Sequence, residues 1–157
     1  MLRLGLTVAI TVAVSDQASK LYFYRYLVEG GRRVVEVLPF FNLVTVWNYG
    51  ISFGLFNSDS RIGGAVFVVL AAVIVVGLLL WLRRVPSALT AVALGLVIGG
   101  ALGNIVDRLR FGAVFDFLDF HAFAWHWPAF NLADSAITVG VAALLIETLF
   151  GGGRSIK

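Results

Sequence analysis

The sequence contains no cysteine and few charged residues. The absence of cysteine excludes a disulfide framework, a thiolate metal site and a cysteine nucleophile, so any chemistry has to use oxygen or nitrogen groups. Charged residues make up 13% of the 157 residues and hydrophobic residues 60%, whereas a soluble domain carries roughly 25% charged and about 45–50% apolar residues. This composition predicts a single small integral membrane domain, residues 1–157, and argues against a water-soluble globule.

Long basic runs and internal repeats are also missing. The net charge is only +3, and the lysines and arginines are dispersed along the chain. Because nucleic-acid sites need basic residues clustered on one surface, we expect no nucleic-acid partner. The sequence also lacks the inverted repeat that is typical of many transporters.

Four segments are candidates for transmembrane helices. The second of them is 21 residues long without any charge and reaches roughly 31 Å as a helix, which is enough to cross the hydrocarbon core. The third and fourth are also long enough to span a bilayer. The first is continuously apolar only over residues 4–14, so it spans only if the helix continues through Asp16 and Lys20. The four segments are residues 4–27, 62–82, 88–106 and 133–150.

The first segment allows two interpretations. In a helix, Asp16 and Lys20 lie one turn apart on the same face, where an ion pair neutralises both charges inside a bundle. The alternative is a cleaved signal peptide, with Arg3 as its basic start, residues 4–14 as its apolar region and residues 13–15 as a small-residue cleavage site. We take the uncleaved transmembrane helix as the prediction.

Four spans place both termini on the same side of the membrane. The short segments on that side carry five basic residues and no acid, and the positive-inside rule therefore predicts that this side is cytoplasmic. The opposite side, with the longer loops 28–61 and 107–132, holds six basic residues mixed with acids: Arg25, Arg32, Arg33, Arg61, Arg108 and Arg110. The five basic residues are Arg3, Arg83, Arg84, Arg154 and Lys157.

The two longer loops differ in composition. Residues 33–38 and 41–48 are rich in Val, Phe and Thr and are separated by Pro39, which predicts two paired strands in a small sheet on the membrane. Residues 111–130 include eight aromatic residues, which favour a membrane interface. The predicted fold class is therefore an all-α membrane protein with four transmembrane helices, a small outer β-sheet and an aromatic-rich outer loop.

Small and polar residues form a stripe on the third segment. Gly95, Gly99 and Gly103 recur every four residues, which favours close helix packing of the GxxxG kind. The stripe continues into Asn104, Asp107 and Arg108, and an interfacial ion pair is the simplest interpretation of the last two.

Two further carboxylates are candidates for catalysis. Asp116 lies in the second outer loop, where it could simply be a solvated loop residue. Asp134 lies at the start of the last helix, where a carboxylate stabilises the helix terminus. If they are held close together in an apolar site, the two carboxylates share one proton. One then serves as general base and the other as general acid, which is the chemistry of peptide hydrolysis by activated water.

The histidines offer no competing site. Neither His121 nor His126 lies in an HExxH motif or accompanies a serine in a nucleophile-elbow setting. We therefore interpret both as interfacial or polar-loop residues, and we expect no metal and no cofactor.

Taken together, the motifs resemble those of lipoprotein signal peptidase, also called signal peptidase II, an aspartic endopeptidase of the bacterial inner membrane. The resemblance covers residues 16–135 in five blocks, and only Phe115 is bulkier than the small aliphatic residue expected before the aspartate. The blocks are Asp16-Gln17-Ala18-Ser19-Lys20, residues 48–54 (Asn-Tyr-Gly-Ile-Ser-Phe-Gly), residues 99–108 (Gly-Gly-Ala-Leu-Gly-Asn-Ile-Val-Asp-Arg), residues 114–117 and residues 130–135.

The resemblance implies a site, a substrate and a location. Asp116 and Asp134 would form the catalytic dyad at the periplasmic membrane surface. The substrate would be a prolipoprotein, cut just before a lipobox cysteine that carries a diacylglyceryl group. The resemblance also implies globomycin as a peptide antibiotic inhibitor, membrane lipid as a further partner, and nine residues that shape the pocket or orient the dyad: Asp16, Lys20, Asn48, Gly50, Asn104, Asp107, Arg108, Asn131 and Ala133.

Two other functions share many of these features. A small multipass transporter or channel subunit would use Asp16, Lys20 and Asp134 as an ion or proton path, although four helices leave little room for alternating access. A non-enzymatic assembly factor that binds lipidated chains differs only in lacking a working dyad. An activity assay separates the three functions.

Overall fold

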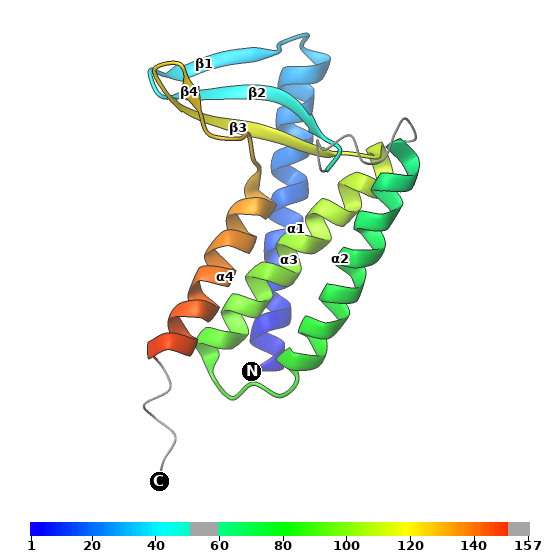
Figure 1. Cartoon of the computed structure of the whole chain (residues 1–157), viewed down its shortest axis with the longest axis vertical. Coiled ribbons are helices and arrows are strands. Elements are labelled where there is room, and N and C mark those ends of the chain that lie inside the picture. Colours follow the sequence, from blue (N-terminus) through cyan, green and yellow to red (C-terminus); the bar gives the residue numbers. More distant parts are fainter. Residues whose placement is uncertain (51–59, 151–157) are drawn as a thin grey trace.

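Figure 1 shows the long helices side by side, with a small sheet across one end of the bundle. The structure, a computed structural model, describes residues 1–50 and 60–150. The second part of the 48–54 motif, residues 51–54, and the basic residues Arg154 and Lys157 lie outside the described residues. The four helices are α1 (Leu2–Phe23), α2 (Ser60–Leu82), α3 (Ala88–Phe111) and α4 (Leu132–Phe150).

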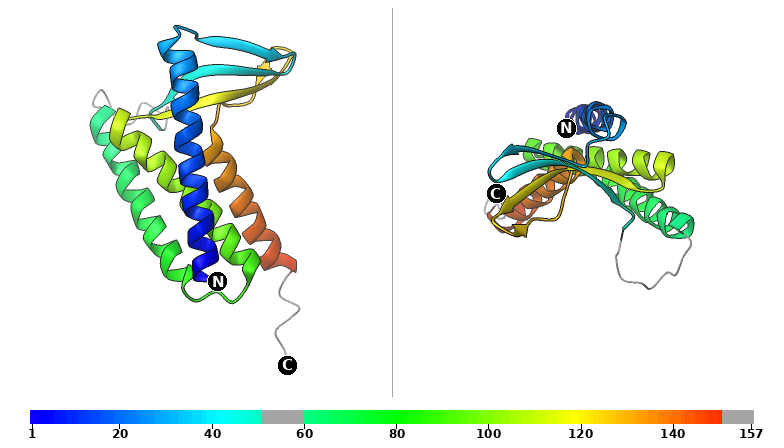
Figure 2. Two further views of the ribbon diagram at one scale, coloured as in Figure 1. Left: turned by 180° about the vertical axis from the view of Figure 1, so that it is seen from behind. Right: turned by 90° about the horizontal axis from the view of Figure 1, so that it is seen from above.

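Three of these helices are long and apolar enough to cross a membrane: Gly64–Leu82, Ala88–Phe111 and Leu132–Phe150. Helix α1 carries Asp16 and Lys20, and both of these side chains are buried against the bundle. It lies along the bundle beside α3, as the view from behind in Figure 2 shows. The start of α1 and the end of α4 lie at the end of the bundle opposite the sheet.

Helix α3 occupies the centre of the bundle and packs against the other three helices. The predicted close packing of its glycines is confirmed. A Cβ atom on Gly95 or Gly99 would meet the backbone of α1, at 2.5 Å from the carbonyl oxygen of Gly5 or Ala9 respectively. The stripe therefore lets α1 approach α3 closely along its length.

Gly99→Ala is expected to destabilise the bundle by about 1–3 kcal/mol, since the added methyl group overlaps the α1 backbone, which cannot move without unpacking the helix. The matched control is Gly77→Ala on α2, where an added Cβ meets nothing within 4 Å. Thermal unfolding in detergent measures both. Equal melting temperatures for the two variants would contradict the tight α1–α3 contact.

The sheet has four antiparallel strands in the order β1-β2-β3-β4. The predicted pair of strands is present as β1 (Val34–Leu38) and β2 (Phe41–Asn48). The second outer segment, predicted as an aromatic loop, instead adds β3 (Val114–Ala122) and the short β4 (Trp125–His126). The prediction missed these strands because the partner of β3 is β2, about 70 residues away, and no local pattern shows such a pairing.

Helix α3 also extends further than the predicted segment 88–106. It continues to Phe111 and ends at Gly112, whose φ of 75° is the left-handed conformation typical of a helix C-cap. Asp107 and Arg108 therefore lie on the last turns of α3, and the expectation that they belong to the outer loop is wrong.

The sheet is attached to the bundle through an aromatic core. Helix α1 continues as a π-helical segment, η1 (Tyr24–Glu29), which carries the chain past the bundle to β1. Leu27 of η1 is completely buried against Phe115 and Phe117 of β3. Phe117 also stacks on Phe23, with 4.5 Å between the ring centroids. This packing fixes β3, and with it Asp116, relative to α1.

Candidate active site

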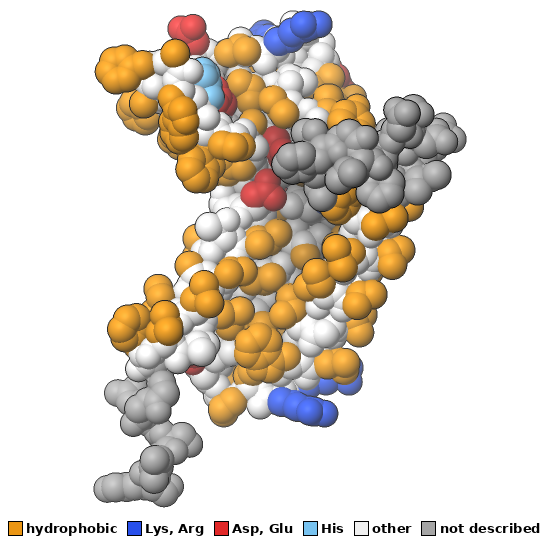
Figure 3. Space-filling model, in the orientation of Figure 1, with side chains coloured by type: hydrophobic (Ala, Val, Ile, Leu, Met, Phe, Trp, Pro, Cys, Tyr) orange, Lys and Arg blue, Asp and Glu red, His pale blue; other side chains and the backbone are white. Residues whose placement is uncertain are grey.

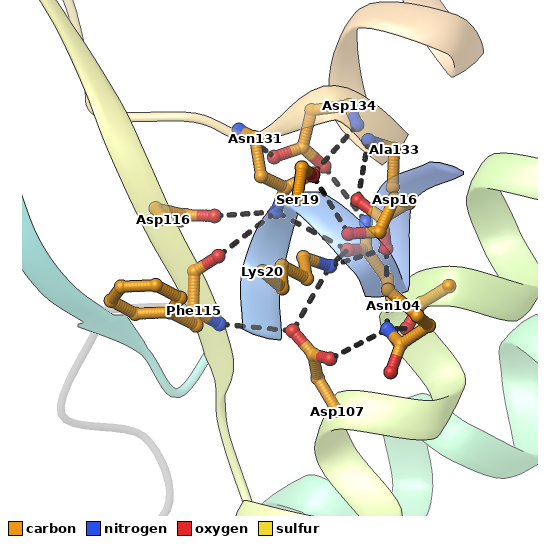
Figure 4. Close-up of polar contacts among 12 residues, drawn as sticks. Asp16, Ser19, Lys20, Asn104, Asp107, Phe115, Asp116, Asn131, Ala133 and Asp134 are labelled. Carbon is orange, nitrogen blue, oxygen red and sulfur yellow. Dashed lines mark hydrogen bonds and ion pairs between the residues drawn. The ribbon is translucent and has the colours of Figure 1, made fainter. Parts of the chain in front are cut away.

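Asp116 and Asp134 come together where the sheet meets the bundle (Figure 4). Asp116 lies on β3 with only 1% of its surface exposed. Asp134 lies in the first turn of α4 and is partly exposed. Figure 3 shows acidic side chains in the recess between the sheet and the helices, so the site opens to the surface there.

Asn131 connects the two carboxylates. Its side-chain Nδ2 donates to Asp116 Oδ1 at 2.6 Å. Its side-chain oxygen accepts from the backbone N–H of Asp134 at 3.0 Å, and its own backbone N–H donates to Asp134 Oδ2 at 3.3 Å. Asn131 is thus the N-cap of α4 and the completely buried link between the aspartates. A cap residue positioned in this way holds both carboxylates in fixed orientations.

Asn48 donates to the other oxygen of Asp116. Its Nδ2 lies 3.1 Å from Asp116 Oδ2. Its own Oδ1 accepts from the backbone N–H of Gly50 at 2.9 Å, which fixes the orientation of the amide. Gly50 has a φ of 98°, and a Cβ there would overlap the ring of Phe67. Glycine is therefore required for the turn that orients Asn48 toward the dyad.

Asn104 of α3 performs the corresponding role for Asp134. Its Nδ2 donates to Asp134 Oδ1 at 2.8 Å. Its Oδ1 accepts from Lys20 Nζ at 3.1 Å and from Asn131 Nδ2 at 3.3 Å. Asn104 therefore connects the dyad to a charged cluster deeper in the bundle.

This charged cluster consists of Asp16, Lys20 and Asp107. Lys20 Nζ lies 2.9 Å from Asp16 Oδ2 and 2.9 Å from Asp107 Oδ2. The predicted i,i+4 pair of Asp16 and Lys20 is thus confirmed. Lys20 also forms an ion pair with a second acid, Asp107. Within the described part of the chain, Asp107 forms no ion pair with Arg108. All three side chains are buried.

Two backbone hydrogen bonds attach this cluster to the elements that carry the dyad. Asp16 Oδ1 accepts from the N–H of Ala133 at 2.9 Å, at the start of α4. Asp107 Oδ2 accepts from the N–H of Phe115 at 3.1 Å, one residue before Asp116. The cluster therefore positions α4 through Asp16 and β3 through Asp107.

Gln17 is a member of this cluster that the sequence analysis did not select. Its Nε2 donates to Asp107 Oδ1 at 2.9 Å, to the carbonyl of Gly103 at 3.1 Å and to Asp16 Oδ2 at 3.3 Å. The sequence did contain a signal that could have selected Gln17. It is an amide next to Asp16 within an apolar helix, where a polar side chain needs a hydrogen-bond partner.

Arg108 lies near the dyad on the last turns of α3. Its guanidinium interacts electrostatically with Asp134, Asp116 and Asp107. Its Nη1 donates to the carbonyl of Asn104 at 3.4 Å, and its buried Nε has no hydrogen-bond partner among the described residues. The side chain supplies positive charge beside two carboxylates.

The environment of Asp116 favours its protonated form. Burial and the negative charge of Asp134 raise the pKa of Asp116 to about 6, although hydrogen bonds from Asn48 and Asn131 stabilise the carboxylate. Two close carboxylates, one buried and the other partly exposed, are suited to sharing a proton.

A second polar cluster lies further along β3 and was also missed. Asp119 accepts from Asn42 Nδ2 at 3.0 Å and contacts His126 Nδ1 at 2.9 Å, and His126 stacks on His121. Burial opposes ionisation of Asp119, but the hydrogen bonds from His126 and Asn42 outweigh it and hold the pKa of that carboxyl below its usual value. This cluster ties β2, β3 and β4 together outside the dyad.

The described residues contain no group of three or more His, Asp or Glu side chains arranged to hold a metal ion. The chemical capacity of the site therefore lies in two carboxylates, the asparagine donors around them and one guanidinium.

Comparison with known proteins matches this chain to one family over nearly its whole length. The sequence profile of the family described as signal peptidase (SPase) II matches residues 8–150. A lipoprotein signal peptidase of Methylobacterium radiotolerans is 45% identical over 154 residues, covering 97% of this chain and 89% of that protein. One of Anaplasma phagocytophilum is 46% identical over 146 residues, covering 93% of this chain and 92% of that protein.

Solved structures agree with the sequence matches. A bacterial membrane enzyme determined by the in meso method at 1.9 Å superposes with a TM-score of 0.78 at 28% identity, covering 93% of this chain and 92% of that one. A second, at 2.3 Å, gives a TM-score of 0.76 at 28% identity, covering 98% and 92% respectively. The chain is thus a bacterial membrane peptidase, and it belongs to the signal peptidase II family of lipoprotein signal peptidases.

Proposed function

We propose that this protein is an aspartic endopeptidase that removes the signal peptide from diacylglyceryl-modified prolipoproteins, cutting just before the lipidated cysteine. The observation that carries the proposal is the joint fixation of Asp116 and Asp134 by Asn131 at the edge of an apolar helical bundle. Membership of the signal peptidase II family supports the substrate class. The lipobox is what the family resemblance implies, and the geometry of the dyad supports the aspartic mechanism.

In the proposed mechanism, one aspartate is ionised and the other is protonated. The ionised carboxylate takes a proton from water as the water oxygen forms a bond to the scissile carbonyl carbon. The protonated carboxyl donates to the carbonyl oxygen, which gives a tetrahedral diol. The C–N bond then breaks as the leaving amine takes the proton from the aspartate that acted as base. One diol hydroxyl returns its proton to the other aspartate, so the new carboxyl group forms and the dyad regains its starting state. We assign the protonated role to Asp116, because it is the more buried of the two and its pKa is raised to about 6.

We propose that the protein spans the inner membrane four times as a single domain, with cytoplasmic termini and a periplasmic dyad. Three helices have the length and composition of spans, and α1 lies beside α3 with its acid and lysine neutralising each other. The dyad lies at the sheet end of the bundle, opposite the basic residues of the α2–α3 connection. This arrangement supports a scissile bond at the membrane surface, next to the lipidated cysteine that follows the signal peptide.

Purified protein in detergent, incubated with a diacylglyceryl-modified precursor, is expected to release a shortened lipoprotein, seen as a gel shift. The unlipidated precursor is the matched control and should remain uncut. Globomycin, the inhibitor that the family resemblance implies, should suppress the shift. Cleavage of both precursors at equal rates would contradict the proposed substrate, and cleavage of neither would contradict the peptidase assignment.

The pH dependence of kcat/KM is expected to fall on the alkaline side with an apparent pKa of about 6, because the dyad loses its shared proton there. Asn48→Ala removes a donor that stabilises ionised Asp116, so the pKa rises and the alkaline limb moves to higher pH. Asn42→Ala on the same strand is the control, since Asn42 contacts Asp119 and not the dyad. A limb that stays in place in Asn48→Ala would refute the assignment of this titration to Asp116.

A further inference from the structure

An apolar groove lies where β3 and β4 meet the β1–β2 turn and the segment that leads to α4. Figure 3 shows hydrophobic side chains gathered on this part of the sheet, above the recess that contains acidic side chains. The groove has a volume of about 410 Å³. We call it the aromatic groove, and its principal lining residues are Phe40, Phe120, His121, Trp125, Trp127 and Phe130.

The lining has the chemistry of an uncharged lipid site. Its side chains are aromatic rings and one methyl group, and three of the rings can donate a hydrogen bond, namely two indoles and one imidazole. None of the side chains that line it carries a carboxylate, an ammonium or a guanidinium group. An acyl ester matches this lining, because its chain is apolar and its carbonyl accepts hydrogen bonds without carrying charge.

The groove is connected to the dyad through two chain segments. Alternation along β3 places Asp116, Leu118 and Phe120 on one face, and Phe120 lies about 13 Å along the strand from Asp116. Phe130 forms backbone hydrogen bonds with Leu118, at 3.0 Å from its N–H and 2.9 Å to its carbonyl. The next residue is Asn131, which holds both aspartates. A ligand in the groove therefore lies about 13 Å along β3 from Asp116, within reach of a lipid attached beside the scissile bond.

We propose that the aromatic groove binds an acyl chain of the diacylglyceryl group on the substrate cysteine. This inference rests on the proposed function, because it assigns the lipid of that substrate to a place beside its scissile bond. The cysteine follows the cleaved bond directly, so its lipid necessarily lies within a short distance of the dyad. The groove is then the element that distinguishes a lipidated precursor from an unlipidated one.

Ala122→Trp tests the proposal by filling the groove, which Ala122 also lines. Two precursors that differ only in their acyl chains, dihexanoyl and dipalmitoyl, are compared. Wild type is expected to have the lower KM for the dipalmitoyl precursor. Ala122→Trp should raise the KM for the dipalmitoyl precursor about tenfold, which corresponds to roughly two methylene groups that are no longer buried. It should leave kcat/KM for the dihexanoyl precursor unchanged.

The matched control is Ala124→Trp, which adds the same side chain at an exposed position in the β3–β4 turn outside the groove lining. It should change neither KM. Equal losses for both precursors in Ala122→Trp, or a chain-length preference that survives the filling, would overturn the proposal. Cleavage of neither precursor by wild type would instead count against the proposed function.

Photolabelling gives a result that does not require turnover. A precursor with a diazirine on its acyl chain is expected to label residues 120–130, and filling by Ala122→Trp should remove that label. A phosphatidylglycerol with the same diazirine should label mainly the lipid-facing helices. Equal labelling of the groove by the phospholipid would assign it to bulk membrane lipid and overturn the substrate assignment.

Discussion

Replacing either Asp116 or Asp134 by asparagine is expected to lower the rate of cleavage by about 10²- to 10⁴-fold, the usual contribution of general acid–base catalysis. Asparagine has nearly the same shape as aspartate but can neither accept a proton from water nor share one with its partner. The double variant should be no worse than the single ones, because either change disables the same unit. Turnover of the lipidated precursor in detergent measures the loss.

The structure also predicts how well these variants fold. Each carboxylate accepts two N–H donors, and an asparagine in its place keeps only one acceptor, so some destabilisation accompanies the loss of activity. Precursor binding and melting temperature therefore have to be measured together with turnover. A variant that binds precursor but does not cut it has lost the chemistry alone.

Two carboxylates outside the dyad serve as controls. Glu36→Gln on β1 changes an exposed acid and should leave turnover unchanged. Asp119→Asn is a stricter test, because it removes an acid from the same strand as Asp116. Asp119 is buried and ties three strands together, so its replacement is expected to lower stability while catalysis persists. Near-normal turnover in either dyad variant, or equal losses in Asp116→Asn and Asp119→Asn, would show that the dyad is wrongly assigned.

Lys20→Met is expected to lower stability by about 3–5 kcal/mol, since it leaves Asp16 and Asp107 buried without their shared cation. Removing all three charges, by Asp16→Asn, Lys20→Met and Asp107→Asn together, should cost less than the single change. The reason is that an unpaired buried carboxylate keeps its desolvation penalty, whereas a neutral amide does not. Thermal unfolding and folded yield in detergent compare the two.

The order of these two effects is the decisive result. A triple variant less stable than Lys20→Met would mean that the hydrogen bonds of Asp16 to Ala133 and of Asp107 to Phe115 matter more than the balance of charge. Wild-type stability in Lys20→Met would mean that the cluster is hydrated in solution, contrary to its burial in the bundle.

The sequence by itself determined the features that depend on neighbours along the chain. Apolar runs of 18 to 21 residues, of which only 133–150 contains charged residues, predicted three helices that the structure describes, at 62–82, 88–106 and 133–150. The reason is that span length is set by bilayer thickness. The four-residue spacing of Asp16 and Lys20 predicted their ion pair, and the glycine spacing predicted the packing of α3. Both follow from the period of a helix.

Only the tertiary structure decided how distant segments meet. The second carboxylate partner of Lys20 is Asp107, 87 residues further along the chain, so its identity depends on α1 lying against α3. The pairing of β2 with β3 brings Asn48 to Asp116, and the N-cap of α4 brings Asn131 to both aspartates. The contacts of Asp116 with Asn131 and with Asn48 join residues 15 and 68 positions apart. The period of a helix or strand determines which face a side chain occupies, but packing determines which residue it contacts on that face. The two aspartates could therefore be selected as candidates from the sequence. Their relative position and their hydrogen-bond partners depend on the tertiary structure.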